Sequence, residues 1–474
     1  MLFDVLATAL ADNPQALRSE SETLSGTALL ERVRTFAEEL RRQDVRRLGI
    51  LLDNGSDWAI ADLATLASGI VSVPIPGFFS PSQQQHLLSD AGLDAVLAPA
   101  PLRDFADPVQ TSCGLLHRLP QSSHTALPAG TARITYTSGT TGTPKGVCLS
   151  EANMLAVARA LHSATAALEV RHHLCVLPLA VLLENIGGLY VPWLSGACVT
   201  LLPMASLGIR GAAGIDTAQL LDTLTAWQPH SLILVPALLP VIIAGRERGL
   251  PDRYRCLALG GGRTSAIHQQ RARDLGLPLF EGYGLSEAAS VVAFNCRGAE
   301  RPGTVGRPLP HVEVRIDPDG GILVRGNRFL GYLGEPEGNA DDWLDTGDRG
   351  HLDADGYLIV DGRRKHTIVT AMGRNVAPEW LEAELCALPD IIQGFVYGDE
   401  EHGLQALVVS RRCDPEALRE TVNAQLPDYA RLDQLHITSH PFSSAWGELT
   451  ANGRLRRTAL LHRIKEASWD FSTV

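Results

Sequence analysis

Short apolar runs alternate with longer helical patterns through most of the chain. The runs are four to six residues long. Between them, apolar residues recur at helical spacing, as in Gly26–Arg42 and Trp58–Ser68. This alternation is typical of α/β folds. We therefore predict an α/β fold with buried strands at Arg47–Leu52, Val71–Pro74, Ala95–Ala98, Leu174–Leu177, Cys198–Leu202, Leu232–Val235 and Cys256–Leu259.

The pattern changes after Gly303, where short strands separated by Asp/Gly turns predict a small sheet or barrel. After Arg363 the chain has its own helical segment, EWLEAELCAL, and its own strand-like runs, IIQGFVYG and LQALVVS. We predict a large N-terminal domain, residues 1–362, made of layered α/β subdomains plus a small β-barrel-like part. A small, mobile α+β C-terminal domain, residues 363–474, follows it.

No segment has the pattern of a membrane span or a secretory signal. The longest charge-free apolar stretch, Ser231–Gly245, has 15 residues and contains Pro236 and Pro240, so we predict a buried strand and turn. The N-terminal sequence MLFDVLATALADNP lacks a basic region and reads as a short amphipathic helix. We expect a cytoplasmic protein without a transmembrane segment.

Composition and charge narrow the function classes. With 474 residues, 45% of them hydrophobic and 20% charged, the chain is an ordinary globular protein long enough for two or three domains. A net charge of −12 argues against nucleic acid as a partner. The eight cysteines form no C-x-x-C pair, which argues against a zinc site or a disulfide framework and favours reduced structural thiols.

The segment ITYTSGTTGTPKGVCL, Ile134–Leu149, is the strongest chemical signal in the chain. Its glycines allow tight turns that expose backbone N–H groups, and its threonines and serine add hydroxyl donors. The loop ends at Lys145, one of three lysines among 41 lysines and arginines. A lysine retained where arginine is the default suggests a site for a compact point charge. The loop therefore predicts a polyphosphate-binding site, and the alternative is a Gly/Thr-rich surface loop.

The order TSGTTGTPKG is not a Walker A sequence and resembles the phosphate loop of the adenylate-forming superfamily. That superfamily contains acyl-CoA synthetases, nonribosomal adenylation domains and luciferases. Further motifs match that superfamily in the same order along the chain. Their residues most resemble those of long-chain fatty-acyl-CoA synthetases. In this loop the resemblance implies nucleotide binding by Thr137, Ser138, Gly139, Thr140, Thr141 and Gly142, and a catalytic role for Lys145.

The second motif is EGYGLSE, which follows a strand ending in LALGGG. The resemblance implies an adenine slot at Gly261 and Gly262, with Tyr283 stacking on the base and Gly284 beside it. It also implies that Ser286 reaches the α-phosphate and that the carboxylate of Glu287 holds Mg²⁺, a cation that prefers oxygen ligands. The alternative is a G-Y-G turn before a helix start.

Two later motifs extend the resemblance. In WLDTGDRG it assigns Asp348 to the ribose hydroxyls. In DGRRKHTIVTAMGRNVAP it assigns Arg363 to the ribose and phosphates, Lys365 to the hinge of the small domain, and Gly373 to the face used in thioester formation. For Lys365 the alternative is a solvated charge in a basic turn.

The fifth motif, GELTANGRLRR, departs from the family. Related synthetases carry a lysine where this chain has Arg454, and that lysine bridges the substrate carboxylate and the phosphate. Arginine keeps the positive charge, but its guanidinium group is larger than an ammonium and directs its N–H donors differently. In PLAVLLEN, relatives place a histidine or aromatic residue near Val181, and Met372 stands where a second glycine is common.

The resemblance implies ATP- and Mg²⁺-dependent activation of a carboxylic acid to an acyl-adenylate. A fatty acid is the favoured substrate, and a medium-chain or aryl acid is the alternative, because a compact chain leaves less protein to build a long acyl tunnel. Transfer to the thiol of coenzyme A follows, with AMP and pyrophosphate as products. One alternative acceptor is the phosphopantetheine of an acyl carrier protein, for which Arg454, Arg456 and Arg457 are a candidate docking face. The competing interpretation is that these arginines serve the site and its helix. A different class of function is a catalytically impaired adenylate-binding protein.

Overall fold

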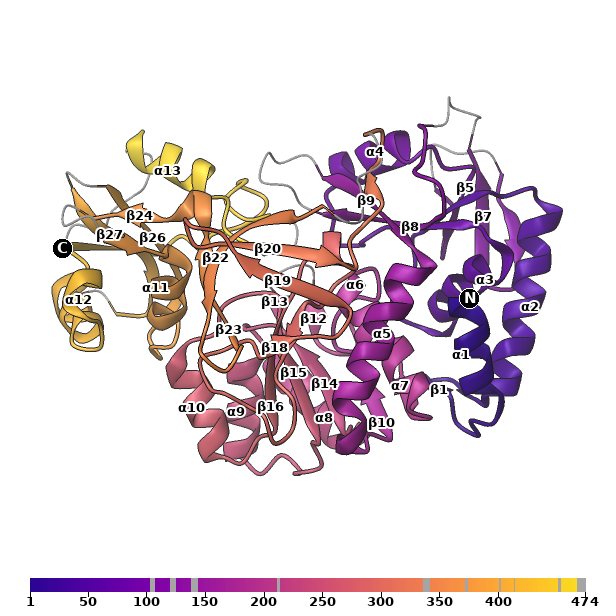
Figure 1. The fold of residues 1–474 in the computed structure, drawn as a ribbon, viewed down its shortest axis with the longest axis horizontal. Coiled ribbons are helices and arrows are strands. Elements are labelled where there is room, and N and C mark those ends of the chain that lie inside the picture. The colour runs from indigo at the N-terminus through magenta and orange to yellow at the C-terminus, as the bar shows by residue number, and fades with distance from the viewer. Residues whose placement is uncertain are drawn as a thin grey trace.

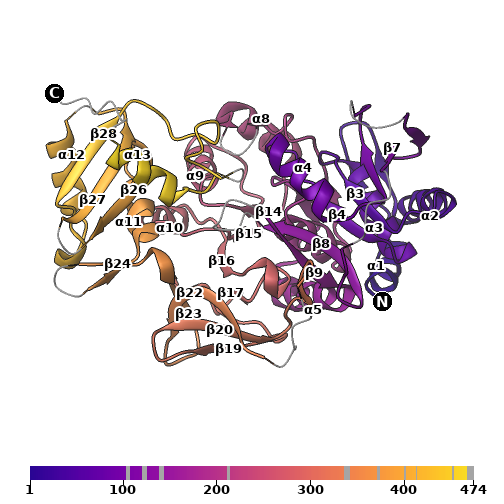
Figure 2. The ribbon, with the colours of Figure 1, turned by 90° about the horizontal axis from the view of Figure 1, so that it is seen from above.

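The computed structural model describes residues 1–102, 107–119, 125–137, 144–210, 214–335, 342–370, 374–399, 402–412, 414–450 and 453–466. Two large mixed sheets form most of the molecule. A four-stranded antiparallel sheet and a smaller C-terminal unit complete the described part. In Figure 1 the C-terminal unit lies at the left. In Figure 2 the four-stranded sheet lies at the bottom of the view, between the C-terminal unit and the large sheets.

The first large sheet has the order β18-β17-β16-β15-β14-β10-β11-β1-β2. Its central strands, from β16 to β1, are parallel. Parallel strands need crossover connections, and the long helical patterns of the sequence supply them. Its strands are β1 (Leu17–Arg18), β2 (Thr23–Leu24), β10 (His172–Leu174), β11 (Cys198–Thr200), β14 (Ser231–Leu234), β15 (Cys256–Leu259), β16 (Leu279–Tyr283), β17 (Ala293–Phe294) and β18 (Arg307–Pro308).

The second large sheet has the order β21-β9-β8-β4-β3-β5-β7-β6. Its centre is parallel from β8 to β5, and antiparallel strands flank it. Its strands are β3 (Arg47–Ile50), β4 (Val71–Pro74), β5 (Ala95–Ala98), β6 (Val109–Thr111), β7 (Gly114–Arg118), β8 (Thr131–Thr137), β9 (Lys145–Ser150) and β21 (Gly331–Tyr332).

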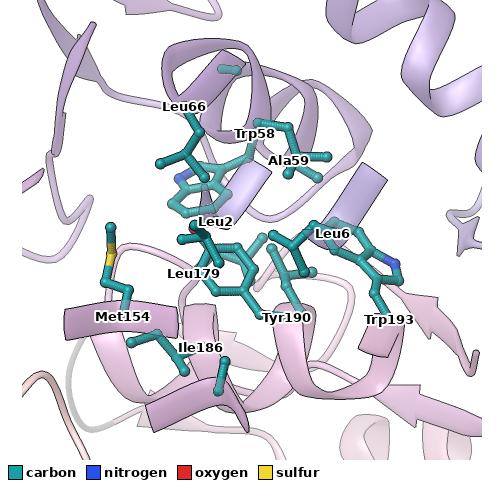
Figure 3. Close-up of a cluster of buried hydrophobic side chains, with 14 of the residues drawn as sticks. Leu2, Leu6, Trp58, Ala59, Leu66, Met154, Leu179, Ile186, Tyr190 and Trp193 are labelled. Carbon is teal, nitrogen blue, oxygen red and sulfur yellow. The ribbon is translucent and has the colours of Figure 1, made fainter. Parts of the chain in front are cut away.

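Helices cover both faces of the large sheets, and a shared core joins them. Figure 3 shows Leu2, Trp58, Tyr190 and Trp193 meeting in this core, where each is almost fully buried. The helices are α1 (Leu2–Ala11), α2 (Gly26–Arg42), α3 (Ser56–Ser68), α4 (Pro81–Asp90), α5 (Glu151–Thr165), α6 (Leu182–Glu184), α7 (Val191–Leu194), α8 (Thr217–Trp227), α9 (Leu239–Glu247) and α10 (Ala266–Asp274), with the 3₁₀ turns η1 (Ala166–Leu168) and η3 (Ser286–Ala288) and the π-helix η2 (Asn185–Tyr190).

A buried polar network holds η2 between the sheets. The guanidinium of Arg133 on β8 donates to Asp62 on α3 and to the side-chain oxygen of Asn185. Asp62 also accepts a 2.6 Å hydrogen bond from the hydroxyl of Tyr190. A buried ion pair is tolerated only when its remaining polar atoms find partners, and here they do. The network therefore fixes the rotation of η2 against the second sheet.

The part after Gly303 folds as the antiparallel sheet β19-β20-β22-β23. This is the small sheet expected from the Asp/Gly turns. A two-stranded ribbon, β12 (Ile209–Arg210) and β13 (Gly214–Ile215), lies apart from it. The four strands are β19 (Val312–Ile316), β20 (Gly321–Gly326), β22 (Leu344–Leu352) and β23 (Leu358–Arg363).

The C-terminal unit has its own buried apolar cluster, which includes Val376, Leu381 and Val408. The boundary expected between residues 362 and 363 falls one residue before the end of β23. The unit contains the 3₁₀ turns η4 (Arg364–His366) and η5 (Asp428–Ala430), strands β24 (Ile368–Val369), β25 (Asn375–Val376), β26 (Ile391–Asp399), β27 (Gly403–Ser410) and β28 (Gln434–Thr438), and helices α11 (Pro378–Leu385), α12 (Pro415–Asn423) and α13 (Arg457–Lys465).

Two element predictions were wrong. The strand expected at Leu174–Leu177 is β10, which spans His172–Leu174, because the strand begins at two histidines that an apolar pattern does not include. The stretch Ser231–Gly245 was expected to be a strand and a turn, but after β14 the chain forms helix α9. Pro240 occupies the first turn of that helix, where the missing N–H costs no internal hydrogen bond. The proline therefore marks a helix start and not a break.

Candidate functional site

The hairpin β8–β9 carries the predicted phosphate loop. Thr137 pairs with Lys145 at the loop end of the hairpin. The intervening residues Ser138, Gly139, Thr140, Thr141 and Gly142 lie outside the described residues. The Lys145 ammonium is 3.4 Å from Glu335 Oε1 and 4.8 Å from the centre of the Tyr332 ring. About half of the Lys145 side chain is exposed, so the cation remains accessible from the cleft.

Glu287 lies close to this lysine through a shared neighbour. It sits in the turn η3, and its Oε1 accepts a 2.9 Å hydrogen bond from the hydroxyl of Tyr332. The main-chain carbonyl of Glu287 accepts a further bond, 2.7 Å long, from the N–H of Phe329. Tyr332 therefore contacts both Lys145 and Glu287. Tyr332 and Glu335 were not predicted from the sequence, because the pairing of β21 with β9 is a contact between distant segments.

The glycine-rich segments lie at the carboxyl ends of adjacent parallel strands. Gly261 follows β15 and has φ +82°, a left-handed conformation that glycine adopts without strain. Gly284 follows β16, and a Cβ there would stand 1.6 Å from the carbonyl oxygen of Ser290. Ligands of open α/β sheets bind outside the carboxyl ends of such strands.

Asp348 is the centre of a hydrogen-bonded group beneath these strand ends. Its Oδ2 accepts a 2.6 Å bond from the hydroxyl of Tyr283, and its Oδ1 is 2.8 Å from Arg363 Nε. Asp348 is 6% exposed. Burial raises the pKa of its carboxyl, and Arg363 opposes that shift. Burial and the neighbouring Asp348 also raise the pKa of Tyr283 well above its usual value. Both carboxylate oxygens are therefore engaged, one by Tyr283 and the other by Arg363.

The C-terminal unit contributes Arg454 to the same region. Its guanidinium donates a 3.2 Å hydrogen bond to the carbonyl oxygen of Gly261. Desolvation by the surrounding protein and the charge of Arg363 lower the pKa of Arg454, while Asp348 raises it. A cation from the small unit thus stands over the glycine-rich strand end of the large one.

Lys365 lies in η4, between β23 and the C-terminal unit. Burial and Arg363 lower the pKa of its ammonium. Gly373 and Met372 lie outside the described residues.

A single cleft of roughly 3060 Å³ brings the predicted residues together. Lys145, Glu287 and Asp348, which the resemblance assigns to one nucleotide site, all line this cleft. The predicted site residues that line it are Thr137, Lys145, Gly261, Gly262, Tyr283, Gly284, Ser286, Glu287, Asp348, Arg363, Lys365 and Arg454.

The cleft continues from these polar groups along an apolar wall. Val181, where relatives place a histidine or aromatic residue, precedes α6 and lines the cleft. The wall is built by Val176, Leu177, Val181, Leu182, Leu183, Gly187, Val191, Ile233 and Ala258.

The basic triplet near the C-terminus does not form a free docking face. Arg454 enters the cleft. Arg457 donates to Glu382 over 2.5 Å and to the carbonyl oxygen of Val396 over 3.1 Å. These contacts favour the interpretation that the arginines serve the site and its helix.

The described cysteines at 113, 148, 175, 198, 256, 296 and 386 form no disulfide with one another. Among the described residues, none of the helices combines the length and apolarity that crossing a bilayer requires.

Sequence relatives share most of this chain. Residues 6–334 match the AMP-binding enzyme family. A long-chain-fatty-acid–CoA ligase of Mycobacterium bovis is 32% identical, over 76% of this chain and 72% of its own. A 2-succinylbenzoate–CoA ligase of Bacillus subtilis is 27% identical, over 81% of this chain and 82% of its own.

Solved structures share the fold. An anthranilate CoA ligase in complex with anthranoyl-AMP has a TM-score of 0.82 at 20% identity, covering 98% of both chains. The O-succinylbenzoate coenzyme A synthetase of Bacillus subtilis, in complex with ATP and magnesium ion, has a TM-score of 0.76 at 24% identity, over 96% of this chain and 98% of that one. Because the family match spans more than half of its length, this chain belongs to the AMP-binding enzyme family and is an enzyme of the acid–thiol ligase class.

Proposed function

We propose that this enzyme activates a fatty acid with ATP and transfers the acyl group to coenzyme A. In the first step a carboxylate oxygen attacks the α-phosphorus, and the bond to pyrophosphate breaks. In the second step a thiolate attacks the carbonyl carbon, a thioester forms and AMP leaves. The thiol proton passes to solvent.

The observation that carries this proposal is the meeting of Arg454 with Gly261 inside a cleft that Lys145 also lines. The first step brings two anions together, so its barrier falls when preorganised positive charge surrounds the phosphates. Lys145 supplies such charge from the large part of the molecule and Arg454 from the small part. Ser286, which lines the same cleft, is the proposed hydroxyl contact to the α-phosphate.

Mg²⁺ fits the carboxylate of Glu287. The Glu287 side chain lines the cleft, and its Oε1 accepts a hydrogen bond from the hydroxyl of Tyr332. Hard divalent cations prefer such oxygen ligands. When bound there, the ion would neutralise phosphate charge.

The nucleotide is proposed to lie across the strand ends. Tyr283 offers the base a ring, and Gly261 and Gly262 leave backbone exposed beside it. Asp348 and Arg363 face the ribose, with Gly284 allowing the close turn. The loop residues Thr137, Ser138, Gly139, Thr140, Thr141 and Gly142 are proposed to hold the phosphates.

A fatty acid suits the apolar wall. The residues from Val176 to Val191 that line the cleft are almost all hydrophobic. Val181 presents a small aliphatic group where a histidine or aromatic residue would narrow the space. The 32% identity to a long-chain-fatty-acid–CoA ligase supports the same class of acid.

The second step is proposed to use a rotation of the C-terminal unit, residues 363–474, about Lys365. Arg454 would leave the cleft, and the face around Gly373 would replace it. Coenzyme A is the preferred acceptor over a carrier protein, because Arg457 is already paired within its own unit.

Carboxylate-dependent exchange of pyrophosphate into ATP tests this function directly. We expect exchange with straight-chain fatty acids and weaker exchange with aryl acids, followed by consumption of coenzyme A. No exchange with any acid of the panel would contradict the ligase and favour an impaired adenylate binder. Loading of a carrier protein without use of coenzyme A would change only the acceptor.

An Arg454→Lys variant belongs in the same assay. A faster exchange than wild type would show that arginine is a compromise in this position. A loss of exchange would show that the site has been built around the guanidinium fork.

A further inference from the structure

Three metal-ligating side chains meet beside the π-helix η2, in a buried layer that the proposed reaction does not use. His173 lies on β10, Cys175 follows that strand, and Glu184 ends α6. Their ligand atoms all lie within 4.8 Å of one another, and each residue is buried. We propose that His173, Cys175 and Glu184 form a zinc site that fixes η2, and with it the apolar wall of the cleft, to the first sheet.

His173 is oriented as a metal ligand. Its Nδ1 lies 2.8 Å from Ser231 Oγ, on the neighbouring strand β14. When Nδ1 donates to that hydroxyl, the lone pair of Nε2 points toward Glu184 and Cys175. Histidine ligands in proteins usually have such a partner on the second nitrogen, because it fixes the tautomer and the ring orientation.

The spacing between His173 and Glu184 suits a shared ion. Nε2 and Oε1 are 3.4 Å apart, which is longer than an ordinary N–H···O hydrogen bond. Two ligands with zinc bonds of about 2.0–2.1 Å at a tetrahedral angle lie about 3.3 Å apart. In addition, Glu184 Oε2 is buried without a hydrogen-bond partner in the part of the chain that the structure describes. A buried carboxylate oxygen without a partner is costly, and a cation beside it removes that cost.

Gly188 packs against all three ligand atoms. A Cβ on Gly188 would lie 2.8 Å from Glu184 Oε1, 3.0 Å from His173 Nε2 and 3.1 Å from Cys175 Sγ. A side chain at this position would therefore crowd the ligand set, whereas glycine lets the three ligand atoms close around an ion.

The donor set and charge favour zinc. A thiolate, a carboxylate and a neutral imidazole carry two negative charges, which Zn²⁺ cancels, so the complex is neutral in the buried layer. Binding releases the thiol proton of Cys175 to solvent. Mg²⁺ and Ca²⁺ prefer oxygen ligands, whereas a mixed nitrogen, sulfur and oxygen set suits zinc. The sequence argued against zinc because it has no close cysteine pair; this cluster uses a single cysteine, joined to its other ligands by the fold.

Metal analysis of the purified full-length protein tests the proposal. The reduced protein, stripped with chelator and re-equilibrated with Zn²⁺, is expected to retain one zinc per chain after desalting. With Co²⁺ it is expected to show tetrahedral d–d bands and a thiolate-to-cobalt charge-transfer band. Zn²⁺ is also expected to raise the thermal midpoint, and this readout does not depend on enzyme activity.

Matched variants separate this site from other thiols. Cys175→Ser should lose the charge-transfer band, whereas Cys113→Ser, which removes another buried thiol, should keep it. Gly188→Ala keeps all three ligands but crowds them and should lose the ion. Glu184→Gln, checked for folding by circular dichroism, provides a second variant. A folded wild-type protein that retains no zinc, or a band that persists in Cys175→Ser, would overturn the proposal.

Discussion

At the scale of single residues, the rarity of lysine points to function. Two of the three lysines, Lys145 and Lys365, line the cleft, and Lys465 ends α13 on the exposed surface. Lys145 is held beside the cleft by the ring of Tyr332 and by Glu335, and both of these side chains come from the segment that follows β20. A compact, rotatable ammonium is thus presented to the proposed phosphates.

Replacing Lys145 with methionine should slow adenylation and leave folding intact. Removing one preorganised electrostatic contact typically costs about 100-fold to 1000-fold in rate. The Lys145–Glu335 pair is half exposed, and such pairs contribute only about 0–1 kcal/mol to stability. Pyrophosphate exchange and thermal unfolding measure the two effects. Lys465→Met is the matched control and should behave as wild type; equal exchange rates in both variants would refute the role of Lys145.

Glu281 should make the protein less stable as the pH rises from about 4.5 to 7. Burial raises the pKa of its carboxyl to about 7, whereas the value for an unperturbed glutamate is 4.5. Between these values the folded state binds more protons than the unfolded state, so stability falls with increasing pH. The thermal midpoint of Glu281→Gln minus that of wild type should therefore be larger at pH 8 than at pH 5. A constant difference would show that Glu281 titrates normally.

At the scale of elements, the site depends on how β15 and β16 end. Both strands run parallel in the first sheet, so their glycine-rich ends open on the same edge. The antiparallel pair β22–β23 then brings Asp348 opposite Arg363 beneath that edge. Three motifs separated by many residues thus meet because of strand register.

Gly284→Ala should disrupt the nucleotide pocket. Its Cβ would stand 1.6 Å from the carbonyl oxygen of Ser290, so the turn after β16 must move and carry Tyr283 with it. We expect the stabilisation by ATP and Mg²⁺ in thermal unfolding to be lost or greatly reduced. Gly77→Ala is the control, because no atom lies within 4 Å of its added Cβ. An unchanged ATP-dependent shift in Gly284→Ala would mean that the turn tolerates a side chain.

At the scale of the whole molecule, the C-terminal unit closes over the cleft. Besides the contact of Arg454 with Gly261, Glu384 on α11 accepts a 3.0 Å hydrogen bond from the backbone N–H of Ala266 at the start of α10. These contacts place the unit in one particular arrangement, which supplies a cation to the glycine-rich edge. The proposed second step requires the unit to leave it.

Crosslinking residues 266 and 384 should separate the two half-reactions. A reducible bifunctional thiol reagent that joins the two cysteines of an Ala266→Cys, Glu384→Cys variant would hold the arrangement that contains Arg454 in the cleft. We expect pyrophosphate exchange to continue while thioester formation stops, and reductant should restore thioester formation. Each single-cysteine variant is a control for the substitution itself. Thioester formation by the crosslinked double variant at the wild-type rate would rule out the rotation.

Much of the fold followed from local patterns. Apolar runs gave β4, β5 and β15 with their observed bounds, because buried strands in α/β sheets are short and continuous in hydrophobicity. The error at Ser231–Gly245 arose because a proline can start a helix as well as interrupt an apolar run. Within the site, each motif was visible because its glycines and charges are adjacent in sequence.

The sequence by itself determined the class of fold, the motifs and the types of chemical group they supply, since these depend on residues close together in the chain. Only the tertiary structure decided which side chains surround those groups. Tyr332 between Lys145 and Glu287, Arg454 on the carbonyl of Gly261, and the cluster of His173, Cys175 and Glu184 all depend on contacts between distant segments. The physical reason is that strand register and helix packing place residues in space, whereas local propensity does not specify which distant elements will pair.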